Sequence, residues 1–85
     1  MTLNLSTLYA QTGRALLARW ADYLDDLMRQ VPPGVDCILT GHAPVWLYLK
    51  VAHALHGRVR VLYYGSPVTG PVEIFNHDPF GEEQG

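Results

Sequence analysis

The sequence predicts a small α/β domain with a mixed sheet of about four strands and two helices. Three observations predict this class. The apolar run 35–39 is rich in β-forming residues, and after a turn at Thr40 and Gly41 a second apolar run continues without a helix breaker as far as Gly57. A third segment, 58–64, has the alternation of a strand, and a turn-rich connection leads to a last one. With a strand and a helix before them, the expected order is β-α-β-α-β-β.

The N-terminal part supplies the first strand and the first helix. Leucines alternate with polar residues over 2–6, the pattern of a short strand. From 13 to 30 apolar residues recur every three or four positions and most charged residues lie on the other side, so we expect an amphipathic helix. Asp22, Asp25 and Asp26 share that charged side with no His or Glu at ligand spacing. We therefore interpret them as a solvated face and not as a metal site.

The strand, turn and helix over 35–56 form the stretch best suited to bind a ligand. Gly41 has no Cβ, so the backbone can turn sharply there and approach a ligand closely. The helix that begins at Pro44 leaves the N–H groups of its first turn free, and such groups favour an anion. Thr40, Gly41, His42 and Pro44 are therefore candidate ligand-binding residues. The alternative is an ordinary strand-to-helix connection that binds nothing.

The helix from Pro44 to His56 is apolar almost all round, because Lys50 is its one formal charge. Such a helix must be covered on two sides. The sheet can cover one side, and the first helix or a second subunit can cover the other. Trp46 in its first turn either stacks on an adenine of a ligand or packs in the core against the first helix.

The C-terminal half closes the sheet with a hairpin. Gly57 ends the helix in the left-handed conformation, and Arg58 to Tyr64 form the next strand. The connection 65–71 reverses the chain, so Val72 to Asn76 returns as the last strand. Residues 78–85 are expected to be a frayed tail.

Length and composition indicate one small domain, 1–85, that gains stability by self-association. A chain of 85 residues buries only about 60–65% of its unfolded surface, so we expect a homodimer or a larger assembly. The single cysteine, Cys37, lies in an apolar strand, excludes an intrachain disulfide and suits a reducing cytoplasm. The N-terminus lacks the pattern of a signal peptide and the longest apolar run ends at Lys50, so a cytoplasmic protein without a membrane partner is expected.

The charges are distributed unevenly along the chain. The net charge is −2, yet the window 37–72 contains no acidic residue and includes Lys50, Arg58 and Arg60. A local field that attracts a polyanion can therefore exist on a weakly acidic protein. Duplex DNA is an unsuitable partner, because it needs an extended basic face that six Lys and Arg residues can hardly supply. A small, multiply charged nucleotide fits better.

Topology predicts where the histidines meet. The helix after Gly41 runs antiparallel to its strand, so the following strand starts at the opposite edge of the sheet. His56 and Arg58 lie at that start, and His77, after the last strand, returns to the same edge. A helix of about 12 residues is about 18 Å long, so this group and the turn at Gly41 cannot bind one phosphate within one subunit. They can do so between facing subunits.

Histidine chemistry would allow this group to cleave a phosphodiester. Such a reaction needs an in-line nucleophile, donors that stabilise charge on the phosphate, and a proton acceptor that works near neutral pH. His56 and His77 can form this acid–base pair, although a polar helix cap and a solvent-facing side chain are the structural alternatives. His53 and His56 can share a metal, but a clear third ligand is missing, so the metal residues stay unassigned.

Four short motifs follow one another between residues 35 and 77. They are Thr40-Gly41 after a strand, Pro44-Val45-Trp46-Leu47 at a helix start, His53 and His56 at the helix end, and His77 after the last strand. This series resembles the core of the CRISPR-associated x-three family, the smallest family of CRISPR ring nucleases. The likeness covers about half of the chain.

The resemblance implies a CARF-like fold and an activity. Family members bind and linearise cyclic tetra-adenylate, the second messenger of type III CRISPR defence, as stacked dimers, with manganese as an assisting metal. The likeness assigns ligand binding to the turn at Thr40–His42 and catalysis to His56 and His77. Arg58, beside His56, is a further candidate for ligand binding.

Two departures from the family pattern keep a second function open. Family members place Asp-Pro-Arg after the penultimate strand, where this chain has Gly65-Ser66-Pro67-Val68. The opening hairpin and short helix of the family are replaced by one possible strand and a long helix. The sequence thus predicts either a ring nuclease or a non-catalytic module that binds cyclic oligoadenylate as a sensor or a sponge.

Overall fold

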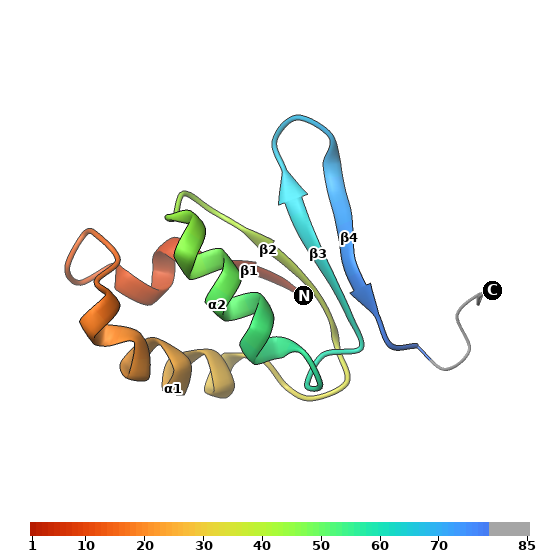
Figure 1. The fold of residues 1–85 in the computed structure, drawn as a ribbon, viewed down its shortest axis with the longest axis horizontal. Coiled ribbons are helices and arrows are strands. Elements are labelled where there is room, and N and C mark those ends of the chain that lie inside the picture. Colours follow the sequence, from red (N-terminus) through yellow and green to blue (C-terminus); the bar gives the residue numbers. More distant parts are fainter. Residues whose placement is uncertain (79–85) are drawn as a thin grey trace.

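The computed structural model describes residues 1–78 and confirms the predicted α/β class (Figure 1). The elements are β1 (Thr2–Asn4), η1 (Leu5–Tyr9), η2 (Leu17–Arg19), α1 (Trp20–Gln30), β2 (Asp36–Thr40), α2 (Val45–Leu55), β3 (Val61–Ser66) and β4 (Gly70–Asn76). The four strands form one sheet in the order β1-β2-β3-β4. β1, β2 and β3 are parallel and β4 is antiparallel to β3, so the sheet is mixed, as predicted.

The helices and the sheet enclose one apolar core. Leu3, Leu39 and Leu62 from the strands, Leu27 from α1, and Leu47, Val51 and Leu55 from α2 are at most 3% exposed. Burying one such side chain contributes about 1.5–3 kcal/mol. Cys37 belongs to the same core, and burial raises the pKa of its thiol, which agrees with its predicted role as a small buried hydrophobe.

The first helix begins later than its periodicity predicts, at Trp20 and not near Gly13. Gly13 has a φ of 76°, and Leu16 is extended with a φ of −119° and a ψ of 124°, so neither residue can continue a helix. The backbone N–H of Leu16 donates to the Tyr23 hydroxyl instead, at 3.0 Å. The apolar period therefore located the face that packs on the core, but the tertiary contact decided where the helix starts.

The penultimate strand also begins later than predicted, at Val61 and not at Arg58. Gly57 ends α2 with a φ of 87°, as predicted, and the backbone N–H groups of Arg58 and Val59 still donate to Leu55. The carbonyl of Arg58 accepts from Gly34, which places residues 57–60 in the connection. Alternation alone could not distinguish this tight connection from the first turn of a strand.

The tip of the hairpin of β3 and β4 projects past the first turn of α2, and α2 lies between that hairpin and α1 (Figure 1). Ser66 pairs with Gly70, so the connecting turn is shorter than the predicted 65–71. β3 therefore continues two residues past the predicted end at Tyr64, and β4 begins two residues before the predicted Val72. The expected fraying of the tail concerns residues 79–85, which lie outside the described part; Asp78 is ion-paired with Arg60. Within residues 1–78 no helix has the length and apolar character required to cross a membrane.

Candidate functional site

The carboxyl ends of the three parallel strands meet at one edge of the sheet, where Asn4, Thr40 and Ser66 end β1, β2 and β3. Ligands of parallel α/β sheets bind outside these ends. An open hollow of about 460 Å³ lies there, lined by Thr40, Gly41, His42, Ala43, Tyr48, Tyr64, Gly65 and Pro67. We call these residues the turn site. The predicted ligand-binding turn therefore forms one wall of a surface hollow.

Gly41 is required by the fold itself. Its φ of 105° lies in the left-handed half of the Ramachandran map, which L side chains rarely adopt. A Cβ at this position would lie 2.0 Å from Oδ1 of Asn4 and 3.1 Å from the backbone nitrogen of Leu5. The close neighbour is thus the N-terminal segment of the same chain, and a larger residue would disturb the turn before any ligand arrives.

Two tyrosine hydroxyls hydrogen-bond to the turn, one from a residue before it in the sequence and one from a residue after it. Tyr48, in α2, donates to the carbonyl of Gly41 at 2.5 Å, and Tyr9, in η1, donates to the carbonyl of His42. The Tyr48 ring packs edge-on against Tyr64 with the ring centroids 5.3 Å apart. Burial, with Tyr64 and Tyr9 nearby, raises the pKa of Tyr48, so its hydroxyl stays protonated and able to donate.

The turn and the first turn of α2 present unpaired backbone donors. The N–H groups of His42, Ala43, Val45 and Trp46 have no hydrogen-bond partner within residues 1–78. Pro44 caps α2 without a side-chain hydrogen bond, and its own nitrogen has no hydrogen to donate. Free amides at a helix N-terminus carry partial positive charge, so an anion is the ligand class that this surface suits.

Trp46 is partly buried and packs against the core cluster. This position agrees with the packing alternative for its side chain. His42, in contrast, is exposed at the turn and is free to approach a bound group. Of the predicted ligand-binding residues, Thr40, Gly41 and His42 line the hollow together, and Pro44 begins the helix beside it.

The other end of α2 brings His56 and His77 into contact. Their Nε2 atoms lie 2.9 Å apart, and the ring centroids are 4.7 Å apart in a T-shaped arrangement. One ring must donate and the other accept at this distance, so the two nitrogens share one proton position. Phe75 packs on His56 with centroids 5.0 Å apart and supports the pair from β4. The structure thus brings these two histidines together at one edge of the sheet, as predicted.

Arg58 lies beside His56 in the sequence, but its guanidinium is directed to the end of α1. Its Nε donates to the carbonyl of Val31 at 2.6 Å, and its Nη2 donates to the carbonyl of Met28 at 3.0 Å. An arginine at this position satisfies carbonyls that a helix end leaves unpaired. Arg58 therefore ties the connection after α2 to the end of α1, and its guanidinium is not directed to the histidine pair.

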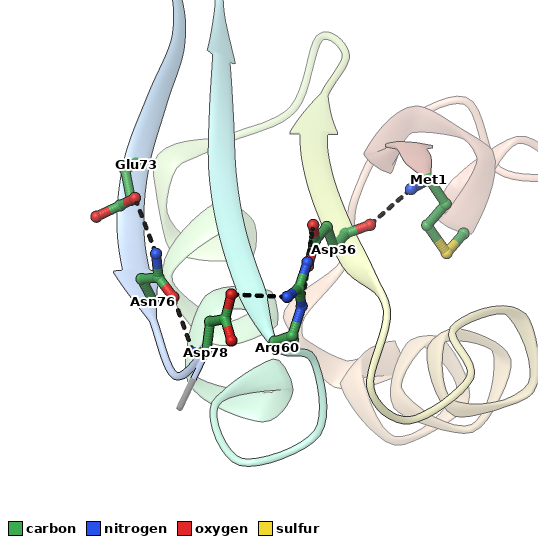
Figure 2. A network of polar contacts seen from close by, with 6 residues as sticks. All are labelled: Met1, Asp36, Arg60, Glu73, Asn76 and Asp78. Atoms are coloured by element: carbon green, nitrogen blue, oxygen red, sulfur yellow. Dashed lines mark hydrogen bonds and ion pairs between the residues drawn. The ribbon is translucent and has the colours of Figure 1, made fainter. Parts of the chain in front are cut away.

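Arg60 is neutralised by two carboxylates (Figure 2). It forms a two-pronged ion pair with Asp36, at 2.9 Å and 2.8 Å, and a further one with Asp78 at 2.8 Å. The guanidinium of Arg60 lowers the pKa of the Asp36 carboxyl, chiefly through these hydrogen bonds. Lys50 lies 5.1 Å from the centroid of the Trp20 ring. The basic window of the sequence is thus divided among structural contacts and forms no continuous cationic surface.

The two candidate sites lie at opposite ends of α2. This helix has 11 residues and is therefore about 16 Å long. The turn site adjoins its first residues and the histidine pair adjoins His56 at its end. One phosphate cannot touch both within one chain, which agrees with the separation predicted from topology.

The described residues do not supply a complete metal site. Within 1–78 no three His, Cys, Asp or Glu side chains are grouped closely enough to hold an ion. His56 and His77 give two imidazole nitrogens, whereas manganese favours oxygen ligands. His53 lines a different groove, between α1 and α2, with Trp20 and Leu49 among its neighbours. The chain alone therefore does not fit the manganese that the resemblance implies.

Tyr9 and Tyr48 were not among the candidates predicted from sequence. Tyr48 comes one helical turn after Pro44, so a helix that starts at Pro44 could have indicated that it faces the preceding turn. Tyr9 offers no such signal, because 33 residues separate it from the carbonyl that it binds.

Comparison with protein families identifies a match. The family described as "CRISPR-associated protein (Cas_csx3)" matches residues 22–82, which is more than half of the chain. The matched segment contains the turn site and both histidines of the pair but not Tyr9. No curated protein and no solved structure matches the chain significantly.

Proposed function

The chain belongs to the CRISPR-associated Csx3 family, and from that premise we propose that it is a ring nuclease. Its substrate in this proposal is cyclic tetra-adenylate, a cyclic oligoadenylate messenger, and its product is the linear form. Opening the ring would switch off type III CRISPR signalling.

The observation that carries the proposal is the contact between His56 and His77. Their Nε2 atoms meet at 2.9 Å although one histidine follows a helix and the other follows a strand. Both rings are on exposed residues, so a phosphodiester can reach them. Histidine is the side chain that most readily exchanges protons near neutral pH. A pair of this kind suits a reaction in which one proton is removed and another is supplied.

The pair can support cleavage through a ribose 2′-hydroxyl of the substrate. A neutral Nε2 removes the hydroxyl proton as the new O–P bond forms, and the second, protonated ring donates to the 5′ oxygen as its bond to phosphorus breaks. The products are a 2′,3′-cyclic phosphate and a 5′-hydroxyl. The hydrogen bond between the rings must open first, so the substrate is inserted between His56 and His77. No step is assigned to manganese, because the chain alone offers only these two nitrogens.

The turn site would hold the messenger through backbone amides. Its lining residues include no Lys or Arg within the described chain, so the attraction for phosphate comes from the free N–H groups and from the start of α2. Because the histidine pair lies at the far end of that helix, we propose that the active site is shared by facing subunits. The assembly would be a homodimer, stacked into a tetramer or larger on the ligand.

A non-catalytic binding module is the second candidate function. The end of β3 and the turn that follows it carry Gly65-Ser66-Pro67-Val68 where the family has Asp-Pro-Arg, so an acid and an arginine are missing beside the turn site. The protein would then bind the messenger as a sensor or a sponge and leave the ring intact.

One experiment separates these candidates. The purified protein is incubated with cyclic tetra-adenylate, with and without manganese, the products are separated by chromatography, and binding is measured by calorimetry. Linear products support the nuclease; tight binding without products supports the module; and the absence of both would make the proposal wrong. Light scattering of the same samples at micromolar concentration tests the assembly, and a mass of 9.5 kDa with and without ligand would contradict it.

A further inference from the structure

The orientation of the peptide groups in the turn is set by side chains outside it. Every peptide bond of the described chain is trans, so the N–H of each peptide points away from its own carbonyl. The carbonyl of Gly41 and the N–H of His42 belong to one peptide group, and the carbonyl of His42 and the N–H of Ala43 belong to the next. Fixing the two carbonyls therefore fixes the two amides.

Tyr9 and Tyr48 fix these carbonyls. Each hydroxyl donates to one of them, Tyr48 to Gly41 and Tyr9 to His42. The consecutive amides of His42 and Ala43 are thereby directed away from the tyrosines, and neither has a partner within residues 1–78. Successive backbone N–H groups in a turn can form a concave site that favours anions.

We propose that Tyr9 and Tyr48 are positioning residues that preorganise the amides of the turn for a phosphate group. The inference rests on the proposed function, because it assumes that the messenger is bound at the turn site. Neither hydroxyl needs to touch the ligand. Each acts on the far side of a peptide group and removes an alternative orientation in which the carbonyl, and not the N–H, would face the phosphate.

The two tyrosines differ in whether the family match covers them. Tyr48 lies within the segment that matches the family, whereas Tyr9 lies in η1, before that segment begins. The N-terminal part of this chain, which the family comparison does not cover, thus contributes directly to the geometry of the turn. Through the hydroxyl of Tyr9, η1 therefore does more than connect β1 to the first helix.

Tyr9→Phe and Tyr48→Phe test the inference, because each keeps the ring and removes the hydroxyl. Tyr23→Phe is the matched control: Tyr23 is a buried tyrosine whose hydroxyl accepts a hydrogen bond from the backbone N–H of Leu16 and not from a peptide group of the turn. Thermal melting should show a similar loss of stability for all three variants. Only the first two should bind cyclic tetra-adenylate more weakly, by about 3- to 10-fold, the effect expected from the loss of one net hydrogen bond.

A second experiment observes the amides directly and does not require the messenger as ligand. The protein is titrated with inorganic phosphate while the backbone N–H resonances of His42, Ala43, Val45 and Trp46 are followed by nuclear magnetic resonance. We expect these resonances to move in the parent and in Tyr23→Phe, and to move less in the other two variants. An unfolded variant is recognised by its collapsed spectrum, and the remaining tyrosine variant then carries the test.

The outcomes distinguish the inference from the proposed function. If the parent bound neither phosphate at the turn nor cyclic tetra-adenylate, the proposed function would fail. If the parent bound and the folded Tyr9→Phe and Tyr48→Phe variants bound equally well, the proposed function would stand and the positioning role would be wrong. The same conclusion would follow if Tyr23→Phe weakened binding as much as they do, because the effect would then come from stability alone.

Discussion

His56 and His77 share a hydrogen bond between their Nε2 atoms at 2.9 Å, although they are 21 residues apart in the chain. Helix α2 delivers the first and strand β4 delivers the second, so the contact depends on the antiparallel return of the hairpin. Because the Nε2 atom of each ring is the hydrogen-bond partner of the other, we expect the two residues to act together in proton transfer.

His56→Ala should abolish cleavage of cyclic tetra-adenylate and spare its binding. A positioned general acid or base contributes roughly 10²- to 10⁴-fold in rate, and the turn site lies at the other end of the helix. Single-turnover assays and calorimetry measure the two effects. Because the histidines act together, His56→Ala and His77→Ala should cost about as much singly as in combination. His53→Ala, an exposed histidine one helical turn earlier, is the matched control and should cleave at the parent rate.

Mixed assemblies test whether the active site is shared. His56→Ala subunits retain the turn, and His42→Glu subunits retain the histidines but place a repelling carboxylate at an exposed turn position. Each variant alone should be inactive, and a mixture of the two should regain part of the parent rate where an intact turn faces an intact pair. A mixture as inactive as its components would contradict an active site shared by facing subunits.

Gly41→Ala should destabilise the fold before it affects any ligand. The residue adopts a φ of 105° and its Cβ would collide with the side chain of Asn4. Gly57→Ala is the matched control, because Gly57 has a φ of 87° but an added Cβ meets nothing within 4 Å. Chemical unfolding should show a loss of roughly 1–2 kcal/mol for Gly57→Ala, from backbone strain, and a larger loss for Gly41→Ala.

Removing the side chain of Asn4 should relieve part of that loss. In a double-mutant cycle, Asn4→Ala combined with Gly41→Ala should be less destabilised than the sum of the single variants. Strict additivity of the two unfolding free energies would show that the collision does not contribute.

Acid should remove the stabilisation that Asp36 contributes. The ion pair with Arg60 lowers the pKa of this carboxyl below its ordinary value of 3.8. A lowered folded-state pKa means that the contribution is fully present above that ordinary value and is lost as the pH falls through the lowered one. Melting temperatures between pH 6 and pH 2 should therefore fall less steeply for Asp36→Asn than for the parent.

The sequence was most informative where local chemistry and chain topology decide the structure. Period-two and helical patterns, with Gly57 as a stop, predicted the order of elements and the position of α2. The direction of α2 placed Gly41 and His56 at opposite edges, and the reversal of the chain before the last strand returned His77 to the edge of His56. These features depend on connectivity, which a single sequence contains in full.

The remaining features depend on contacts between distant residues. The late start of α1 follows from the hydrogen bond between the N–H of Leu16 and the hydroxyl of Tyr23. The direction of the Arg58 guanidinium follows from its hydrogen bond to the carbonyl of Met28 in α1, 30 residues away. The turn at Gly41 is an example. The sequence predicted a sharp turn there, but not that Asn4 is the close neighbour of Gly41 or that tyrosines from two elements hydrogen-bond to the turn. No periodicity or motif reports such contacts.

The strands lie in the sheet in the order in which the chain is synthesised, since each strand pairs with the one before it. Pairing between consecutive strands keeps loops short and can proceed from the N-terminus during synthesis. By the time residue 67 has emerged, β1, β2, β3, both tyrosines and every residue of the turn site are available to assemble. His77 comes only after the last strand, so the histidine pair is the final part to form. In a nascent chain, the surface that would capture the messenger is therefore complete before the pair that would destroy it.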